Sequence, residues 1–297
     1  MNMQELRTYL CTFFAEFNYR QQDADCLLSA FDRIVMCAGA RDLLAACVKA
    51  YEDDYTCDFA ELVQKADGMA GLTGVQEYTA ELLVCLCLTP RLRALYAERG
   101  ISQEIYRATV LDLKYKLEEC VLIYGVAGTF VPCWQAGFFR LTRFCLGRLQ
   151  FEVVPFKATY EKNGVTLLPD TKVINVHIPR SGEPLTERAC REAYLLAKEF
   201  FRDEVQNDPC PFVCHSYLLY PDNAHFLPPH TNTYRFLKSF DIYEVEVDKE
   251  RENLWRMFDT QEKNVDKLPT DTSMRRAFVA HLKNGGKMGC GRGVLFV

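Results

Sequence analysis

The sequence predicts a two-domain α+β protein, in which an all-helical N-terminal domain (residues 1–130) precedes a mixed α/β domain (residues 131–297). Two observations carry this prediction. Over roughly the first 125 residues, apolar side chains recur at the three- and four-residue spacing of helices. After Gly147, short segments alternate apolar and polar residues, as strands do. A chain of 297 residues is long enough for one large or two ordinary domains.

Helix patterns and helix-end signals define the N-terminal half. The first helix is predicted from an apolar stripe that comprises Leu6, Leu10, Phe13, Phe14 and Phe17. Thr89 followed by Pro90 predicts a helix start, and Gly100 is the matching stop. Ser102 is expected to cap a long helix that ends at Gly125.

The centre of the C-terminal half predicts a strand–helix–strand unit. We expect a helix over residues 135–146, then strands in LQFEVVPF (149–156) and GVTLLPDTKVINVHIP (164–179). Thr186 is the expected N-cap of a helix from Glu187 to about Phe201. The strand PFVCHSYLLYP (211–221) follows, and a right-handed parallel crossover should join the two strands that flank the helix.

The remaining segments predict further short elements. In chain order these are a short helical piece over 232–236, a strand over 241–248, a possible partner strand over 253–260, a helix over 272–286 and a terminal strand over 293–297.

Composition narrows the class of protein. The net charge is -5, and Lys and Arg form no basic block, so we expect no nucleic-acid partner. The start MNMQELRTYL has the amphipathic pattern of a helix and not the basic flank and apolar run of a signal peptide. No segment has the apolar length of a membrane span. We therefore expect a cytoplasmic protein without a membrane partner.

The 14 cysteines do not predict a metal site or a disulfide framework. Most lie inside apolar runs, where cysteine behaves as a small buried hydrophobic residue. Cys85 and Cys87 are two residues apart on a predicted helix and would point to different faces, which disfavours zinc. We expect no metal cofactor.

Five phrases of the C-terminal half resemble a known family when they are taken together: GRLQFE (147–152), VHIPRSGEPLT (176–186), CHSYLL (214–219), LPPHTNTYRF (227–236) and TSMRRAFVAHLKNGG (272–286). They are similar to a bacterial family of acyltransferases with a helical N-acyltransferase N-terminal domain and a C-terminal domain like the GNAT acyl-CoA N-acyltransferases. The resemblance implies a GNAT-like sheet, and acetyl-CoA or another acyl-CoA as co-substrate. It also implies a small-molecule or peptide amine as acceptor, and it leaves the oligomeric state open.

The same resemblance places the pyrophosphate of acyl-CoA at the turn before the helix that starts at Glu187, where unpaired amides favour anions. The residues expected to bind it are Arg180, Ser181, Gly182, Leu185 and Thr186. Glu183 and Leu185 stand where the family pattern has small residues, and Pro184 removes one donor amide. The alternative for this turn is an ordinary capped helix without a ligand.

Candidate catalytic residues lie on the strands that flank this turn. Glu152 or His215 is the expected base, and His177 shares a strand face with Asn175, either as a catalytic group or as half of a hydrogen-bonded pair. Tyr220 could protonate the departing thiolate. The expected function is acyl transfer from acyl-CoA to an amine. The alternative is a non-catalytic GNAT-derived module that binds a ligand or a protein.

Overall fold

The computed structural model describes residues 1–162 and 164–297. It divides into two compact units, Met1–Phe144 and Cys145–Val297.

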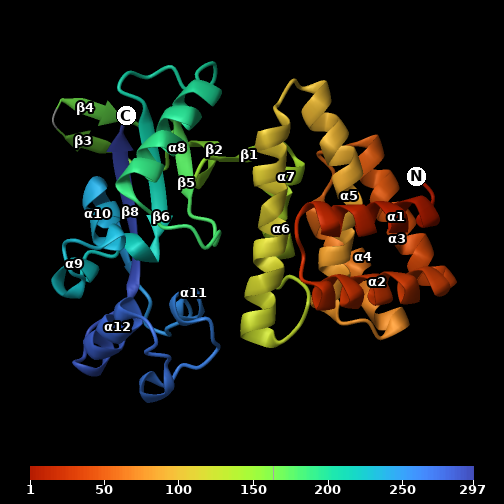
Figure 1. Cartoon of the computed structure of the whole chain (residues 1–297). Coiled ribbons are helices and arrows are strands. Elements are labelled where there is room, and N and C mark those ends of the chain that lie inside the picture. Colours follow the sequence, from red (N-terminus) through yellow and green to blue (C-terminus); the bar gives the residue numbers. More distant parts are fainter. Residues whose placement is uncertain (163) are drawn as a thin grey trace. The chain divides into compact units, whose positions relative to one another are not determined.

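The first unit is built of helices, as predicted (Figure 1). α5 is its most buried helix: between Thr79 and Thr89 every residue is buried, so α5 is enclosed by its neighbours on all sides. The elements of this unit are α1 (Met3–Glu16), α2 (Gln21–Met36), α3 (Ala38–Asp53), α4 (Phe59–Thr73), α5 (Glu77–Glu98), α6 (Gln103–Tyr124), η1 (Pro132–Gln135) and α7 (Ala136–Phe139).

One predicted helix boundary in this unit is wrong and another is confirmed. Pro90 lies inside α5 and does not begin a helix. Proline has no N–H to donate to the carbonyl four residues earlier, and here the Thr89 hydroxyl donates to that carbonyl, of Leu86, at 2.6 Å. The expected limits of α6 hold: Ser102 Oγ accepts a hydrogen bond from the Ile105 amide, and Gly125 closes the helix with φ 70°.

The second unit contains a six-stranded sheet in the order β1-β2-β5-β6-β8-β7. Only the central pair of strands, β5 and β6, is parallel among the pairs with a described register, and α8 connects them. The strands are β1 (Arg143–Leu146), β2 (Leu149–Pro155), β5 (Lys172–His177), β6 (Pro211–Ser216), β7 (Asp241–Val247) and β8 (Gly289–Phe296), with a separate hairpin of β3 (Tyr160–Lys162) and β4 (Val165–Leu167). The helical elements are α8 (Glu187–Phe200), η2 (Tyr217–Leu219), α9 (Asn223–Phe226), α10 (Asn232–Ser239), α11 (Leu254–Phe258), η3 (Val265–Lys267) and α12 (Ser273–Lys283).

Two expected elements of the C-terminal half differ from the structure. The expected helix over residues 135–146 is limited to η1 and α7, because Leu141 adopts φ 57° and ends it before β1. The possible strand over 253–260 is the helix α11, because its apolar residues Leu254, Met257 and Phe258 have helical spacing and enter one buried cluster with Phe278 of α12.

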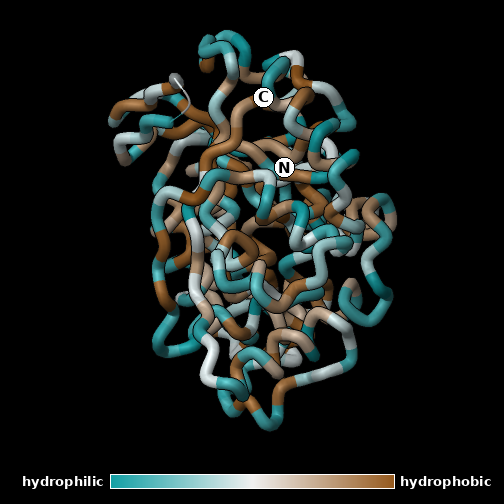
Figure 2. Tube along the Cα trace, turned by 90° about the vertical axis from the view of Figure 1, so that its left-hand side faces the viewer, coloured by the Kyte–Doolittle hydropathy of each residue, from teal (hydrophilic) through white to brown (hydrophobic). Residues whose placement is uncertain are grey.

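The two faces of the sheet differ in character. On one face Tyr194 of α8 packs on Phe151 of β2 and Phe212 of β6, with ring centroids 6.2 and 5.2 Å apart. The opposite face carries an apolar cluster around Val173 and Val213, and further along these strands it carries polar residues. Figure 2 shows hydrophobic and hydrophilic residues interspersed along the chain.

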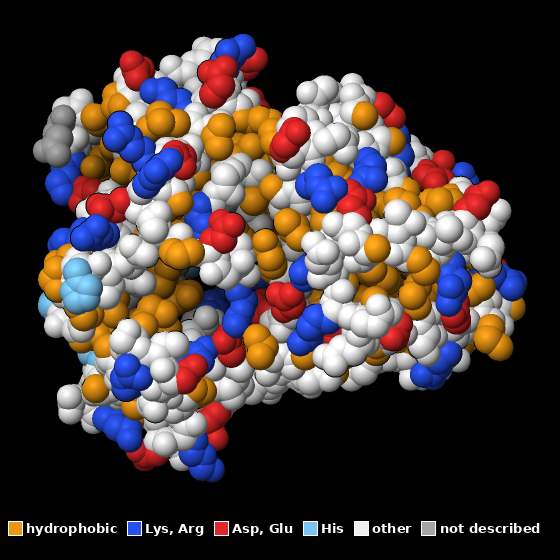
Figure 3. All heavy atoms as spheres, viewed as in Figure 1, with side chains coloured by type: hydrophobic (Ala, Val, Ile, Leu, Met, Phe, Trp, Pro, Cys, Tyr) orange, Lys and Arg blue, Asp and Glu red, His pale blue; other side chains and the backbone are white. Residues whose placement is uncertain are grey.

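The face of the molecule seen in Figure 3 carries charges of both signs. Basic and acidic side chains are interspersed on the visible face (Figure 3). In the part of the chain that the structure describes, every helix is too short or too polar to cross a membrane.

Candidate functional site

Three polar side chains form a hydrogen-bonded group on one face of β2 and β5. The antiparallel register places Glu152 opposite Asn175 and Gln150 opposite His177, which makes Glu152 and His177 diagonal neighbours. His177 Nε2 lies 2.7 Å from Glu152 Oε1, and Asn175 Nδ2 lies 3.3 Å from that oxygen and 3.2 Å from His177 Nε2. The side chains of His177 and Glu152 are 18% and 16% exposed. In this partly buried setting the carboxylate can orient the imidazole strongly.

The polar face continues across the sheet from His215. His215 on β6 lies opposite Arg292 on β8, and Arg292 lies opposite Glu244 on β7. The Arg292 Nε and a Glu244 carboxylate oxygen are 3.4 Å apart, and His215 Nε2 lies 3.9 Å from Glu246 Oε2. Burial and then the charge of Arg292 lower the pKa of His215, while Glu246 and Glu244 act in the opposite direction. The His215 imidazole is therefore favoured in its neutral form, as a base must be.

The parallel ladder between β5 and β6 ends before either strand does. Its paired positions are Ile174 with Phe212 and Asn175 with Val213, whereas β5 runs on to His177 and β6 to Ser216. His177 and His215 each stand two residues beyond the last pair, and the two-residue period of strands puts both on the polar face. The structure thus brings both predicted histidines to the point where the two central strands part.

The turn between β5 and α8 leads into a capped helix N-terminus. Thr186 is the N-cap, and its Oγ1 accepts a hydrogen bond from the Ala189 amide at 3.2 Å, as predicted. Gly182 adopts φ 78° with open space where a side chain would be. Arg148 fixes the turn by donating to the carbonyls of Pro179 at 3.1 Å and Glu183 at 3.0 Å. This turn therefore has a second arginine that the sequence did not single out.

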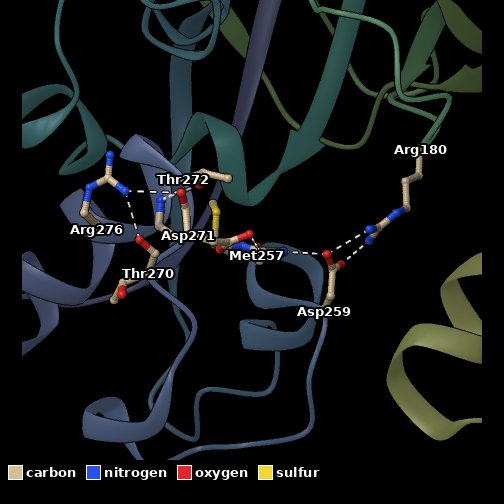
Figure 4. A network of polar contacts seen from close by, with 8 residues as sticks. Arg180, Met257, Asp259, Thr270, Asp271, Thr272 and Arg276 are labelled. Carbon is tan, nitrogen blue, oxygen red and sulfur yellow. Dashed lines mark hydrogen bonds and ion pairs between the residues drawn. The ribbon is translucent and has the colours of Figure 1, made fainter.

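Arg180 is held by an acidic residue from a distant part of the chain. Its guanidinium forms a two-point ion pair with the carboxylate of Asp259, which follows α11 (Figure 4). Burial alone would raise the pKa of Asp259, but hydrogen bonds and charges from Arg180 and Arg275 outweigh it and lower that pKa. Any phosphate that approaches Arg180 therefore meets a guanidinium whose orientation is already fixed.

Tyr220 lies apart from this group of polar residues. It follows η2 and is 4% exposed, and burial raises the pKa of its phenol. Its ring packs against Gly289 at the start of β8. No contact between Tyr220 and Glu152, His177 or His215 occurs among the interactions of the described residues.

A cleft of about 270 Å³ lies on the other face of the sheet, between α8 and α10. Apolar side chains, among them Leu185, Tyr194 and Phe236, form most of its wall. Arg235 and Glu187 both line it and form an ion pair at 2.9 Å. Of the predicted turn residues, Leu185 contributes to this cleft.

Residues 1–162 and 164–297 contain no group of three or more His, Cys, Asp or Glu side chains arranged to hold a metal ion.

The family relationship is decided by comparison with domain families. The GNAT-like C-terminal domain model matches residues 143–295, more than half of the chain. The chain belongs to the GNAT-like C-terminal domain family. The N-acyltransferase N-terminal domain model matches residues 9–141, so both domains of the expected family are confirmed in the expected order.

Solved structures share the fold of this GNAT-like protein at low sequence identity. One is an acyltransferase in complex with decanoyl-CoA and teicoplanin, with 22% identity and a TM-score of 0.73 over 96% of this chain and 86% of that one. Another is a mutant acyltransferase in complex with octanoyl-CoA, with 20% identity and a TM-score of 0.73 over 98% and 88% of the two chains. No curated protein matches the sequence. At this identity the likeness shows a common fold.

Within the GNAT-like domain, sequence reasoning found the main polar residues of the sheet but not their partners. Asp259 lies in the segment for which the sequence predicts a possible strand, and nothing in its local sequence indicates a partner 79 residues away. Arg292 and Glu244 were not singled out. The alternation of Glu244 and Glu246 in DIYEVEVD, which puts both on one strand face, was the available signal.

Proposed function

We propose that the protein transfers an acyl group from acyl-CoA to an amine, with His177 as general base and Glu152 as the carboxylate that orients it. The observation that carries this proposal is the 2.7 Å contact between His177 Nε2 and Glu152 Oε1 at the point where β5 and β6 part. A proton on Nε2 would be donated to the carboxylate, and Nδ1 would then be the basic nitrogen of the ring. Glu152 also stabilises the imidazolium that forms when the base takes up a proton.

The reaction needs one bond exchange and two proton transfers. The amine nitrogen attacks the thioester carbonyl carbon, a C–N bond forms and the C–S bond breaks. The proton lost by the amine goes to His177, and the CoA thiolate leaves and is protonated to the thiol. Positioned general bases commonly contribute about 10²–10⁴-fold to such rates.

The turn before α8 supports acyl-CoA as the donor. Gly182 has open space around it, and the first turn of α8 presents amides without intrahelical partners. Arg148 and Arg180 add positive charge to the turn, and Glu183 opposes it. Under this proposal Arg180, Ser181, Gly182, Leu185 and Thr186 remain the candidate residues for the CoA phosphates and their surroundings. The acyltransferases of the same fold were crystallised with decanoyl-CoA, octanoyl-CoA and CoA, which supports a medium-chain acyl donor.

His215 and Tyr220 take secondary places in this mechanism. His215 is 39% exposed and its lowered pKa keeps it neutral, so it is the candidate to pass the proton from the active centre to water. Tyr220 is buried, its pKa is raised, and it packs against Gly289. We therefore assign Tyr220 a packing role and leave the thiolate to be protonated by water or by the imidazolium of His177.

The acceptor is proposed as a small-molecule or peptide-type amine. One acyltransferase of the same fold was crystallised with teicoplanin and another complex contains CoA and 10C-teicoplanin. A teicoplanin-type glycopeptide with a free amine is therefore the first acceptor to test, beside simple amino sugars and short peptides.

The test is an acyl-transfer assay with the purified full chain. Acetyl-, octanoyl- and decanoyl-CoA are each incubated with the candidate amines, and released CoA thiol and acylated product are measured by thiol reagent and mass spectrometry. We expect amine-dependent release of CoA and a matching mass increase of the acceptor, both lost in His177→Gln.

Two results would contradict the proposal. If His177→Gln transfers acyl groups as fast as the unchanged protein, His177 is not the base. If no acyl-CoA binds to the folded protein in calorimetric titration, the alternative of a non-catalytic GNAT-derived binding module is the better description. The ion pair that occupies Arg180 and the acidic Glu183 in the turn are the features that would then explain the loss.

A further inference from the structure

The cleft between α8 and α10 exists because the two helices cover different strands of the sheet. Tyr194 of α8 packs its ring on Phe212 of β6, with ring centroids 5.2 Å apart. Phe240, which follows α10, covers β8 instead: a methyl group added at Gly293 would lie 2.8 Å from Phe240 Cβ. Leu295 of β8 is the register partner of Phe212, lines the cleft and is only partly buried. The two helices therefore leave an apolar part of the sheet uncovered.

The size and the wall of this cleft suit a small apolar chain. Besides Leu295, the wall is formed by Leu185 of the turn before α8, by Cys190 and Tyr194 of α8, and by Phe236 of α10. The volume is about 270 Å³. An apolar cavity of about 150 Å³ holds one benzene ring, so the cleft has room for a ligand of about eight to ten carbon atoms. Transfer of such a chain from water to this wall is favourable, since it removes apolar surface from water.

The charged side chains that line the cleft favour an anion. They are Glu187, Arg191 and Arg235, so basic side chains outnumber acidic ones. Arg235 and Glu187 pair at 2.9 Å, but they are 46% and 67% exposed, so this pair is weak and can rearrange. Arg191 forms no hydrogen bond or ion pair within the part of the chain that the structure describes. The carbonyl oxygen of Val297, which also lines the cleft, accepts from Lys198 Nζ at 3.0 Å. The charge of Arg191 is therefore available to a ligand.

We propose that this cleft binds a medium-chain monocarboxylate such as octanoate, with the chain on the apolar wall and the carboxylate at Arg191 and Arg235. The ligand is a free carboxylate and not the acyl group of a thioester, because a thioester carries no negative charge for these guanidinium groups to bind. The inference goes beyond the proposed acyl transfer, since the cleft lies on the face of the sheet opposite His177 and Glu152. It holds whether or not the protein transfers acyl groups.

The experiment titrates the purified full chain with sodium octanoate and follows binding by calorimetry and by NMR of labelled leucine methyl groups. We expect saturation at one site with a dissociation constant of about 1 mM or lower. The methyl signals of Leu185 and Leu295, which both line the cleft, should shift with the same dissociation constant. Octanol has the same chain without the carboxylate and should bind about tenfold more weakly. Acetate has the carboxylate without the chain and should not bind measurably.

Three variants locate the charge and the chain of the ligand. Arg191→Gln should raise the dissociation constant of octanoate about tenfold, because it removes a charged donor at the carboxylate. Arg188→Gln is the matched control: it removes the same charge from the same helix, at a side chain that is 87% exposed and does not line the cleft, and should change binding less than about twofold. Ser239→Phe places a ring in the cleft and should abolish binding. If Ser239→Phe fails to fold, the methyl shifts of the unchanged protein locate the chain instead.

Four results would overturn the inference. They are no saturable binding of octanoate, binding that leaves the methyl signals of Leu185 and Leu295 in place, equal binding of octanol and octanoate, and equal effects of Arg191→Gln and Arg188→Gln. Octanoyl-CoA provides a further comparison. If it shifts the same methyl signals while CoA does not, the cleft takes the acyl chain of the donor, and the inference is wrong while the proposed function stands. Absence of acyl transfer in a protein that binds octanoate as expected would remove the proposed function alone.

Discussion

Arg292 on β8 lies directly opposite His215 on β6, so a permanent positive charge stands beside a titratable imidazole in the middle of the sheet. Glu244 on β7 pairs with Arg292 from its other side. Burial is the main cause of the lowered pKa of His215, and Arg292 is the next. The relationship makes His215 a neutral group at neutral pH, and its titration can be changed by a substitution that leaves the imidazole itself intact.

We expect Arg292→Gln to raise the pKa of His215 towards its ordinary value, because one of the two main lowering causes is removed. Because the pKa of His215 is lower in the folded state, the unfolded state binds more protons than the folded state at pH values between that lowered pKa and the ordinary value of 6.5. Stability therefore rises with pH across that window, and Arg292→Gln should flatten the rise. The pKa is measured by NMR titration of the His215 ring, with Arg276→Gln as control. An unchanged or lower pKa of His215 in Arg292→Gln would show that Arg292 does not lower this pKa.

Glu152→Gln should lower kcat about 10–100-fold with little change in the KM for acyl-CoA. The amide keeps the shape of the side chain but cannot stabilise an imidazolium at His177 by charge. The measurement is steady-state kinetics over a range of pH, because loss of the carboxylate should also shift the acidic limb of the profile, where protonation of His177 removes the base. Glu161→Gln on the exposed hairpin strand β3 is the control. Equal activity of both variants would rule out the role of Glu152.

Gly289→Ala should destabilise the protein by about 1–3 kcal/mol, the usual range for overpacking. An added methyl group would lie 2.1 Å from the Glu246 carbonyl oxygen and 2.6 Å from Tyr220 Cε2, so backbone and ring would both have to shift. Urea denaturation measures the free energy of unfolding. Gly71→Ala in the last turn of α4 serves as the comparison: an added methyl group there meets no other atom, and the change should stabilise the protein by up to about 0.5–1 kcal/mol. A neutral Gly289→Ala would show that β8 can move away from Tyr220.

Glu81 in α5 should make the stability of the protein fall as pH rises. It is 9% exposed, its Oε2 has no hydrogen-bond partner, and burial, with the nearby charges of Asp67 and Glu77, raises its pKa to about 8. The folded state therefore holds a proton that the unfolded state loses above the ordinary value of 4.5, so stability decreases between that value and about 8. Glu81→Gln should flatten this decrease, as measured by urea denaturation at pH 5 and pH 8.5. Equal slopes in both proteins would place the cause elsewhere.

Helices with clear capping residues could be predicted from the sequence alone. α6 and α8 begin and end where their caps predicted, because Ser102, Thr186 and Gly125 satisfy helix-end groups by contacts within a few residues. The extent of α5 could not be predicted in this way, because Thr89-Pro90 has the sequence of a helix start. The helix accommodates Pro90 because the Thr89 hydroxyl donates to the carbonyl that the proline leaves without a backbone donor. The stretch over residues 253–260 was equally ambiguous, because a run of eight residues is compatible with a short strand or a short helix until its packing partner is known.

Taken by itself, the sequence determined the two-domain α+β architecture, the family, and the polar residues His177, His215 and Glu152 on neighbouring strands. Periodicity and capping are local properties, and they suffice for this. The tertiary structure decided which of these residues meet: the β2–β5 register brings Glu152 to His177, and the path of α11 brings Asp259 to Arg180. Those pairings join residues 25 and 79 positions apart. They depend on strand register and on the packing of distant helices, for which a single sequence carries no local signal.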